Sequence, residues 1–216
     1  MINLLIELIL AYVLDSTKEL DDWDNYYKKN DVETMPWFLE ELDHDVLNEI
    51  NSKTLKEGRF LDLGTGPGTQ ANRLSSLGFD VIGSDLSQSA IEKAKKIYSK
   101  PEFVVDDILN SKFPDNEFDF IFDRGTFHIF EKEQLSSYLS QIQRILRKNG
   151  LLFLKCMSVE ENNLPEGKGP YLYSKELLRD IFKKDFEIEN IKNTLFFGTF
   201  TPPPKAIFTV LKNKKI

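Results

Sequence analysis

Cysteine and histidine are scarce in this chain, and their scarcity excludes two kinds of site. The 216 residues include one cysteine, Cys156, and two histidines, His44 and His128. A single thiol cannot form a disulfide framework, and these three residues cannot supply the usual zinc ligand sets. We therefore expect no metal site and no disulfide-stabilised extracellular fold. A reducing, cytoplasmic setting fits this composition.

An excess of basic residues is also missing. The chain has 28 Lys and Arg residues against 35 Asp and Glu residues, which gives a formal net charge of -7. Proteins that bind nucleic acids usually carry a basic face, so we expect no nucleic-acid partner. Hydrophobic residues make up 41% and charged residues 29% of the sequence. These fractions are typical of a soluble globular domain, and we expect a single domain over residues 1–216.

Long hydrophobic runs are absent apart from residues 2–14, which read INLLIELILAYVL. A membrane-spanning helix needs about 20 apolar residues, so we expect no stable membrane insertion. The run also lacks the basic start and the cleavage site of a signal peptide. A helix that is apolar nearly all round is usually buried, here against the domain or against a second copy in a homodimer. Weak membrane association and a wrongly assigned start site are the alternatives.

Apolar, β-rich runs alternate with helical patterns through the middle of the chain. The runs are residues 59–63, 79–84, 102–105, 118–123 and 151–156. Continuously apolar strands separated by helices are typical of a parallel sheet covered on both faces. The last helical pattern in this stretch extends to Asn149 and Gly150, a helix stop signal.

The C-terminal part predicts a different connection. A helical pattern over about residues 175–184 is followed by strand-like runs at 186–197 and 206–212. Three prolines between these runs suit a hairpin loop better than a helical crossover. The sequence therefore predicts an α/β, three-layer Rossmann-like fold. Its seven-stranded, mostly parallel sheet has an antiparallel last strand. A helical N-terminal extension (1–54) precedes the core (55–216).

The first strand runs into a glycine-rich turn, FLDLGTGPGTQ, at residues 60–70. Gly64, Gly66 and Gly68 permit positive φ angles and let a ligand approach the backbone. Their spacing is neither the G-x-G-x-x-G of dinucleotide folds nor a P-loop. Asp85 ends the second strand 21 residues after Gly64 (85 − 64), where a carboxylate can accept both ribose hydroxyls. Asp62 would repel a pyrophosphate and attract a cationic amino group.

These motifs resemble the class I S-adenosylmethionine-dependent methyltransferases. The acid-x-G-x-G-x-G pattern, the acid that ends the second strand and the Asp-Asp-Ile-Leu after the third all match, over about residues 55–157. The resemblance implies S-adenosylmethionine as the cofactor. It implies cofactor contacts from Asp62, Gly64, Thr65, Gly66, Gly68, Asp85, Leu86, Asp106, Asp107, Ile108, Asp123 and Trp37.

The same resemblance assigns parts of the cofactor to these residues. The three glycines would lie against the methionine part, Asp62 would hold its amino group, and Asp85 would hold the ribose. Leu86 would pack on the adenine, and Asp107 and Ile108 would meet its edge, with Asp106 as the competing candidate for the amine. Asp123 and Arg124 would line the methyl-transfer side.

The methyl acceptor depends on the segment FDRGTFHIF, residues 122–130. It lacks the Asn/Asp-Pro-Pro-Tyr/Phe motif of DNA adenine and glutamine methylases. It resembles the small-molecule branch of thiopurine and tellurite-resistance methyltransferases. Elongation-factor lysine methyltransferases share an Asp-Lys-Gly-Thr pattern but continue with Asp-Ala instead of histidine. We therefore expect a small-molecule nucleophile, a thiol or a related acceptor. A protein-lysine methyltransferase and a non-catalytic cofactor-binding subunit are the alternatives.

Aromatic residues and one histidine complete the expected acceptor side. Trp23, Tyr26, Tyr27 and Trp37 precede the core and could cover the sulfonium, since a cation over an aromatic face is stabilised by about 0.5–2 kcal/mol. His128 follows the fourth strand and could act as a general base for a thiol or hydroxyl. A purely structural role for each is the alternative.

Overall fold

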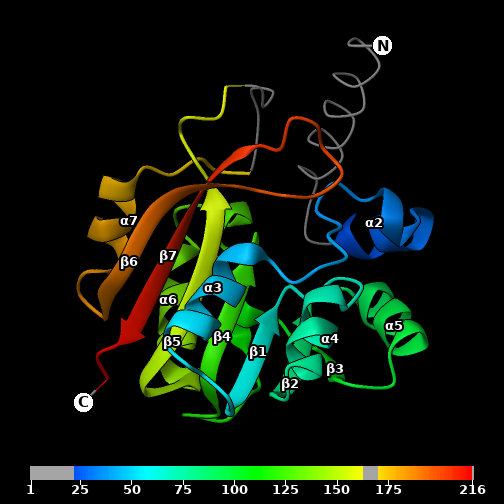
Figure 1. Cartoon of the computed structure of the whole chain (residues 1–216), viewed down its shortest axis with the longest axis horizontal. Coiled ribbons are helices and arrows are strands. Elements are labelled where there is room, and N and C mark those ends of the chain that lie inside the picture. Colours follow the sequence, from blue (N-terminus) through cyan, green and yellow to red (C-terminus); the bar gives the residue numbers. More distant parts are fainter. Residues whose placement is uncertain (1–21, 163–169, 216) are drawn as a thin grey trace.

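The computed structural model describes residues 22–162 and 170–215. It contains one seven-stranded sheet with the order β3-β2-β1-β4-β5-β7-β6 (Figure 1). Strands β1 to β5 pair in parallel, and β7 runs antiparallel to both β5 and β6. The strands are Arg59–Leu63 (β1), Asp80–Asp85 (β2), Glu102–Val105 (β3), Phe118–Arg124 (β4), Leu146–Met157 (β5), Phe186–Leu195 (β6) and Lys205–Asn213 (β7). The predicted fold class is confirmed.

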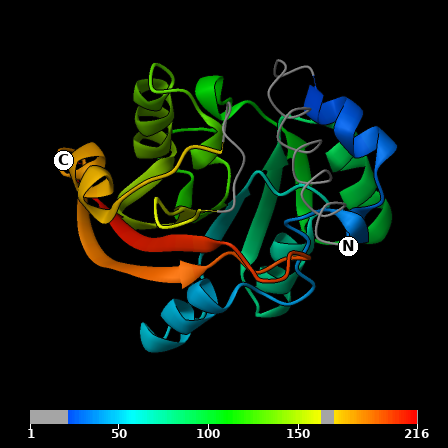
Figure 2. The same cartoon turned by 90° about the horizontal axis from the view of Figure 1, so that it is seen from above.

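The described residues contain six α-helices, five of which cover the two faces of this sheet, as Figure 2 shows from above. The helices are Asp22–Lys29 (α2), His44–Ser52 (α3), Thr69–Ser76 (α4), Gln88–Ile97 (α5), Leu135–Ile145 (α6) and Lys175–Phe182 (α7). Short 3-10 turns follow β3 (Ile108–Asn110, η2) and β4 (Phe127–Ile129, η3), and one precedes α3 (Val32–Thr34, η1).

Alternate residues of each central strand enter opposite cores. In β4, Ile121 belongs to the cluster under α6 and α7, whereas Phe122 belongs to the cluster under α3, α4 and α5. Strand β5 divides in the same way at Leu152 and Phe153. Both faces of these strands are buried, which is why the strands read as continuous apolar runs in the sequence.

The boundary between α6 and β5 differs from the prediction. The helix ends at Ile145 and the strand begins at Leu146, four residues before the expected stop signal at Gly150. Between the pairs Phe118–Leu146 and Phe120–Leu151 the register shifts, and Asn149 takes a φ of 62°. The extra residues form a bulge in β5, and Asn149, which tolerates positive φ, accommodates it.

The described part of the N-terminal extension contains two α-helices, α2 and α3, joined by a loop with the short turn η1, and both helices contact the core. Helix α2 lies beside α5 in both views (Figures 1 and 2), and Asp24 Oδ1 accepts a hydrogen bond of 2.7 Å from the Ser89 amide. Further along, α3 packs Val46 and Ile50 into the core. Residues 2–14 lie outside the described residues. Within the described residues, no helix combines the length and the apolar character that a membrane crossing requires.

Candidate functional site

The glycine loop follows β1 with three left-handed residues. Gly64, Gly66 and Gly68 have φ angles of 67°, 51° and 84°. A side-chain carbon on Gly66 would lie 2.6 Å from the Tyr27 hydroxyl, and one on Gly68 would lie 2.6 Å from the Phe103 ring. Gly68 therefore serves the packing of α4 against the sheet, whereas Gly66 keeps the backbone bare beneath the N-terminal extension.

Two carboxylates hold this loop from the ends of neighbouring strands. Asp62 Oδ2 accepts hydrogen bonds from the Thr65 hydroxyl at 2.5 Å and from the Ala71 amide at 3.0 Å. Asp85 Oδ2 accepts from the Gly66 amide at 2.9 Å. Burial raises the pKa of Asp62 and that of Asp85 to about 6, although the hydrogen bonds oppose the shift.

The adjacent aspartates after β3 occupy different environments. Asp107 is exposed, and its Oδ1 accepts from the Leu109 amide at 2.9 Å, which leaves Oδ2 to face solvent. Asp106 is buried; its Oδ1 accepts from the Lys112 amide at 2.8 Å, and its Oδ2 has no partner among the described residues. Ile108 is buried in the core, and Leu86 is 37% exposed. Asp107 and Leu86 are therefore the better placed to meet a ligand.

Asp123 lies inside the protein, which corrects the expectation that it lines the methyl-transfer side. Its side chain is completely buried, and it accepts from the Thr126 amide at 2.8 Å and the Tyr138 hydroxyl at 2.7 Å. Burial raises the pKa of Asp123 to about 6, against the effect of these hydrogen bonds. The carboxylate fixes the turn after β4 and does not face a substrate.

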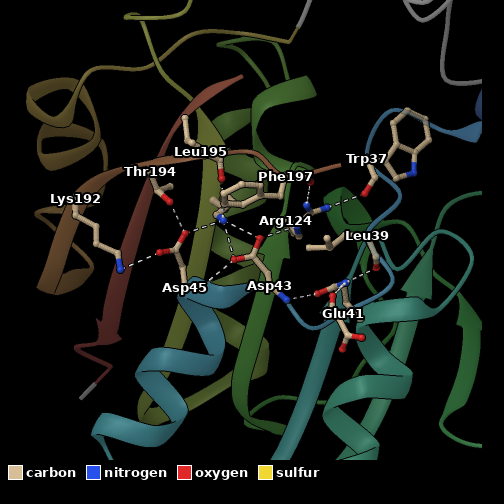
Figure 3. Close-up of polar contacts among 12 residues, drawn as sticks. Trp37, Leu39, Glu41, Asp43, Asp45, Arg124, Lys192, Thr194, Leu195 and Phe197 are labelled. Atoms are coloured by element: carbon tan, nitrogen blue, oxygen red, sulfur yellow. Dashed lines mark hydrogen bonds and ion pairs between the residues drawn. The ribbon is translucent and has the colours of Figure 1, made fainter. Parts of the chain in front are cut away.

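Arg124 joins segments that are distant in the sequence. Its guanidinium donates 2.9 Å hydrogen bonds to Asp43 and to the Trp37 carbonyl, and another to the Phe197 carbonyl (Figure 3). It also lies over the Phe196 ring, 4.5 Å from the centroid. Through these contacts Arg124 positions the N-terminal extension and the hairpin loop.

His128 is not suited to the general-base role that the sequence suggested. It is 7% exposed, and its Nδ1 accepts a 3.1 Å hydrogen bond from the Met157 amide. Burial and the nearby Arg124 guanidinium lower the pKa of His128 to about 3. An effective base has a pKa near the working pH, so this neutral ring is a poor proton acceptor.

A buried ionic network was missed by sequence reasoning. Lys155 Nζ lies 2.7 Å from Asp43 and 2.7 Å from Asp45, and all three side chains are nearly inaccessible. Asp45 also pairs with Lys192 at 2.8 Å and accepts from Thr194 at 2.7 Å (Figure 3). Burial raises the pKa of Asp45, but the two ammonium groups outweigh it and hold the value at about 2. A lysine inside the apolar run of β5 was the available signal.

The expected aromatic group of Trp23, Tyr26, Tyr27 and Trp37 does gather above the glycine loop. Its ring centroids lie 5.4 to 6.4 Å apart. Trp37 also packs on a second apolar cluster at the ends of β5 and β7 and in the hairpin loop. That cluster contains Met157, Phe196 and Ala206, with Leu172 against it. Trp37 thus connects the glycine loop side with the hairpin side.

Comparisons with known proteins agree with this arrangement. A family model described as a methyltransferase domain matches residues 60–150. An uncharacterised methyltransferase of Schizosaccharomyces pombe is 30% identical over 129 residues, which are 57% of this chain and 89% of that protein. The chain belongs to the methyltransferases. It is an S-adenosylmethionine-dependent enzyme of the class I fold.

Two further relatives of this methyltransferase are named for an activity. Thiocyanate methyltransferase 1 of Brassica oleracea is 27% identical over 80% of this chain and 76% of that protein. Protein-lysine N-methyltransferase efm4 of Schizosaccharomyces pombe is 28% identical over 61% of this chain and 71% of that protein.

Solved structures support the fold of the methyltransferase. The structure solved for conversion of a disulfide bond into a thioacetal group during echinomycin biosynthesis has a TM-score of 0.76 at 24% identity, covering 89% of this chain and 92% of the other. Burkholderia thailandensis 1,6-didemethyltoxoflavin-N1-methyltransferase, with bound S-adenosylhomocysteine, has a TM-score of 0.69 at 16% identity, covering 95% and 89%.

The residues present fit S-adenosylmethionine. The backbone of Gly66 carries no side chain, Asp85 ends β2, and Leu86 and Asp107, which follow the ends of β2 and β3, have exposed side chains. When bound, the cofactor supplies an electrophilic methyl group on a sulfonium. The residues that would hold it are the glycine loop with Asp62, together with Asp85, Leu86 and Asp107.

Binding of S-adenosylhomocysteine by the methyltransferase should strengthen as the pH rises through about 6. Asp62 and Asp85 have pKa values of about 6, and only their ionised forms bind an ammonium group or accept two hydroxyls. The stability of the ligand-free protein should change in the opposite direction. The corresponding carboxyls of the unfolded chain ionise near pH 4, so the folded state binds more protons between about pH 4 and 6. The free energy of unfolding should therefore fall as the pH rises through this range. Calorimetric titration and thermal unfolding across this range test both signs, and a pH-independent affinity would contradict the assignment.

Substitution of the two adjacent aspartates should separate a ligand contact from a structural one. Asp107→Asn keeps an oxygen for the Leu109 amide but presents an amide nitrogen to the adenine amine. We expect S-adenosylhomocysteine to bind about tenfold more weakly, the scale of one hydrogen bond to a charged group. Asp106→Asn, at a buried position, should change stability more than affinity. Equal affinities of the Asp107→Asn variant and the native protein would exclude the contact.

Proposed function

We propose that this methyltransferase transfers a methyl group to a small-molecule nucleophile, a thiol or a related soft acceptor. One observation carries the proposal. An apolar wall of Trp37, Met157, Phe196 and Ala206 lies at the carboxyl ends of the strands, next to the turn after β4. Such a wall suits a small, weakly hydrated acceptor and excludes water. The likeness to a thiocyanate methyltransferase over 80% of the chain supports the same acceptor class.

The protein's contribution to this reaction is alignment. When bound, S-adenosylmethionine would supply the methyl group, and the residues around the site would hold the acceptor in line with that group. Proximity and orientation can supply several kcal/mol of the barrier reduction without a charged catalytic group. The side chains suited to this task are Trp37 on the N-terminal extension and Phe196 in the hairpin loop, which Arg124 holds in place.

Methyl transfer to a protein lysine is the second candidate, and the likeness to efm4 favours it. Incubation of the enzyme with methyl-labelled S-adenosylmethionine and two lysate fractions distinguishes the candidates. Label in the low-molecular-mass fraction supports the small-molecule proposal, and label on protein overturns it. If neither fraction is labelled while S-adenosylhomocysteine still binds, a partner-dependent, non-catalytic subunit becomes the better description.

Two further proposals concern the setting of the enzyme. A cytoplasmic location is supported by its one cysteine, Cys156, which is a buried free thiol; imaging of a tagged chain tests it. A homodimer formed through residues 2–14 rests on the sequence alone. Light scattering on the full chain and on a chain lacking those residues tests that assembly.

A further inference from the structure

We propose that His128 positions the methyl acceptor by donating a hydrogen bond from Nε2, and that the acceptor must therefore enter the site already ionised. The inference rests on the proposed function, because it concerns the acceptor of that same reaction. It replaces the general base expected from the sequence with a donor, and it narrows the acceptor to anions such as thiolates.

The hydrogen bond from Met157 fixes the tautomer of His128. The Met157 amide, at the end of β5, donates to Nδ1 at 3.1 Å. Met157 is held in place by its pairing with Ala206 of β7. A neutral imidazole carries one donor and one acceptor nitrogen, so the proton lies on Nε2. Taking up a second proton at Nδ1 would bring two donors face to face.

The space beside Nε2 is kept open by Gly125. This residue has a φ of 105°, and a side-chain carbon there would lie 3.4 Å from Nε2 and 3.1 Å from the Phe196 ring. The glycine keeps a side chain of its own out of the gap between the imidazole and the Phe196 ring, so an acceptor that reaches Nε2 would meet the N–H on one side and an apolar ring on the other. No described residue makes a hydrogen bond to Nε2.

This space lies beside the cofactor loop. The next residue, Thr126, donates from its hydroxyl to the Leu63 carbonyl at 3.1 Å and packs directly against Gly64. The turn after β4 therefore touches the start of the glycine loop. An acceptor held by His128 would lie between that loop and the apolar wall.

The charges around His128 favour an anion over a neutral thiol. Arg124 is the charged side chain whose field acts on the ring, and it lies over Phe196, whose ring centroid is 5.8 Å from that of His128. Its charge is shared with Asp43, which it contacts at 2.9 Å. Tyr171 approaches from the loop after β5, where its amide donates to the His128 carbonyl at 2.6 Å. None of the described carboxylates accepts a hydrogen bond from His128, so among the described residues the ring has no acidic partner that would favour its protonated form.

The charge of the acceptor decides whether a proton must be removed during methyl transfer. An anionic acceptor gains the methyl group and becomes neutral, so no proton has to leave. A neutral thiol would have to lose its proton before the transfer, and His128 cannot take it. The rate with a thiol should therefore follow the ionisation of the thiol itself.

Nitrogen-15 NMR of the imidazoles tests the donor assignment without activity. The chain has two histidines, and a His44→Gln variant assigns the remaining signal to His128. We expect Nε2 protonated and Nδ1 unprotonated from about pH 5 to 8, as burial requires. Thiocyanate added to the S-adenosylhomocysteine complex should shift the Nε2–H signal. An averaged, titrating ring in this range, or no response to thiocyanate, would overturn the proposal.

Steady-state kinetics with thiocyanate and 2-mercaptoethanol as acceptors are the second test of the proposal. His128→Leu should raise KM for thiocyanate about tenfold, the scale of one hydrogen bond to a charge, and leave S-adenosylhomocysteine affinity unchanged. His128→Gln, which keeps an N–H donor, should restore most of the loss.

The thiol rate should rise with pH toward the thiol pKa in the native protein and in both variants. A plateau near pH 6 to 7 that disappears in His128→Leu would instead identify a base. Labelling of lysate protein alone would overturn the proposed function. The NMR experiment tests the donor role of His128 independently of that result.

Discussion

Replacing Lys155 with methionine will lower the free energy of unfolding by about 3–5 kcal/mol, the usual cost of leaving a buried charge without its partner. The ammonium group is completely buried and lies 2.7 Å from carboxylate oxygens of Asp43 and Asp45. Methionine has a similar length and fills the same space, so the loss isolates the charge. Arg124 would remain as a partner of Asp43, but no other buried cation among the described residues contacts Asp45.

Lys192→Met provides the matched control. Lys192 pairs with the other oxygen of Asp45 at 2.8 Å, but its side chain is 38% exposed. Exposed ion pairs contribute about 0.2–1 kcal/mol, so the free energy of unfolding of this variant, measured in urea, should remain close to that of the native protein. Adding Asp45→Asn to Lys155→Met should recover part of the loss, because one unpaired charge is removed. Equal costs for the two lysine variants would show that burial of the network is unimportant.

Asp85→Asn should weaken the binding of S-adenosylhomocysteine about 100-fold, since two hydrogen bonds to a charged acceptor are lost. The carboxylate ends β2 and accepts from the Gly66 amide at 2.9 Å and from the Ser87 amide at 2.9 Å. An asparagine can offer one oxygen to these groups, so the glycine loop also loses an anchor. Isothermal calorimetry measures the affinity, and thermal unfolding detects any loss of stability.

The control for Asp85 lies on the same strand. Asp80→Asn makes the same change at the opposite end of β2, where the side chain is 68% exposed and pairs with Arg59 at 3.5 Å. It should leave the affinity unchanged. If both variants bind equally well, Asp85 does not hold the ribose, and the proposed cofactor position at the end of β2 is wrong.

The strands and the glycine loop could be predicted because their signals are local. Residues 59–63 and 102–105 read as short apolar, β-rich runs, and they form β1 and β3 within those bounds. Burial on both faces explains the run in β1, which is a central strand, whereas β3 lies at the edge of the sheet and is partly exposed. Similarly, the left-handed residues of the loop could be expected from glycine alone.

The environments of His128, Asp123 and Lys155 could not be predicted, because their partners are distant in sequence. His128 meets an amide 29 residues away, and Lys155 meets Asp43 at a separation of 112 residues. A residue type next to a strand end indicates a site, but its protonation state depends on these partners. The early start of β5 was missed for a similar reason, because pairing with β4 outweighs a local helical pattern.

The contacts of Arg124 have a consequence for synthesis on the ribosome. This side chain ties the carbonyl of Trp37, made early, to that of Phe197, made near the end of translation. Domains assemble from the N-terminus as they emerge, and contacts between distant segments form slowly. A nascent chain can therefore complete strands β1 to β4 and the glycine loop while the wall around Phe196 is still missing. Until the final hairpin leaves the exit tunnel, the polypeptide holds the glycine loop without the apolar wall that we propose to face the acceptor.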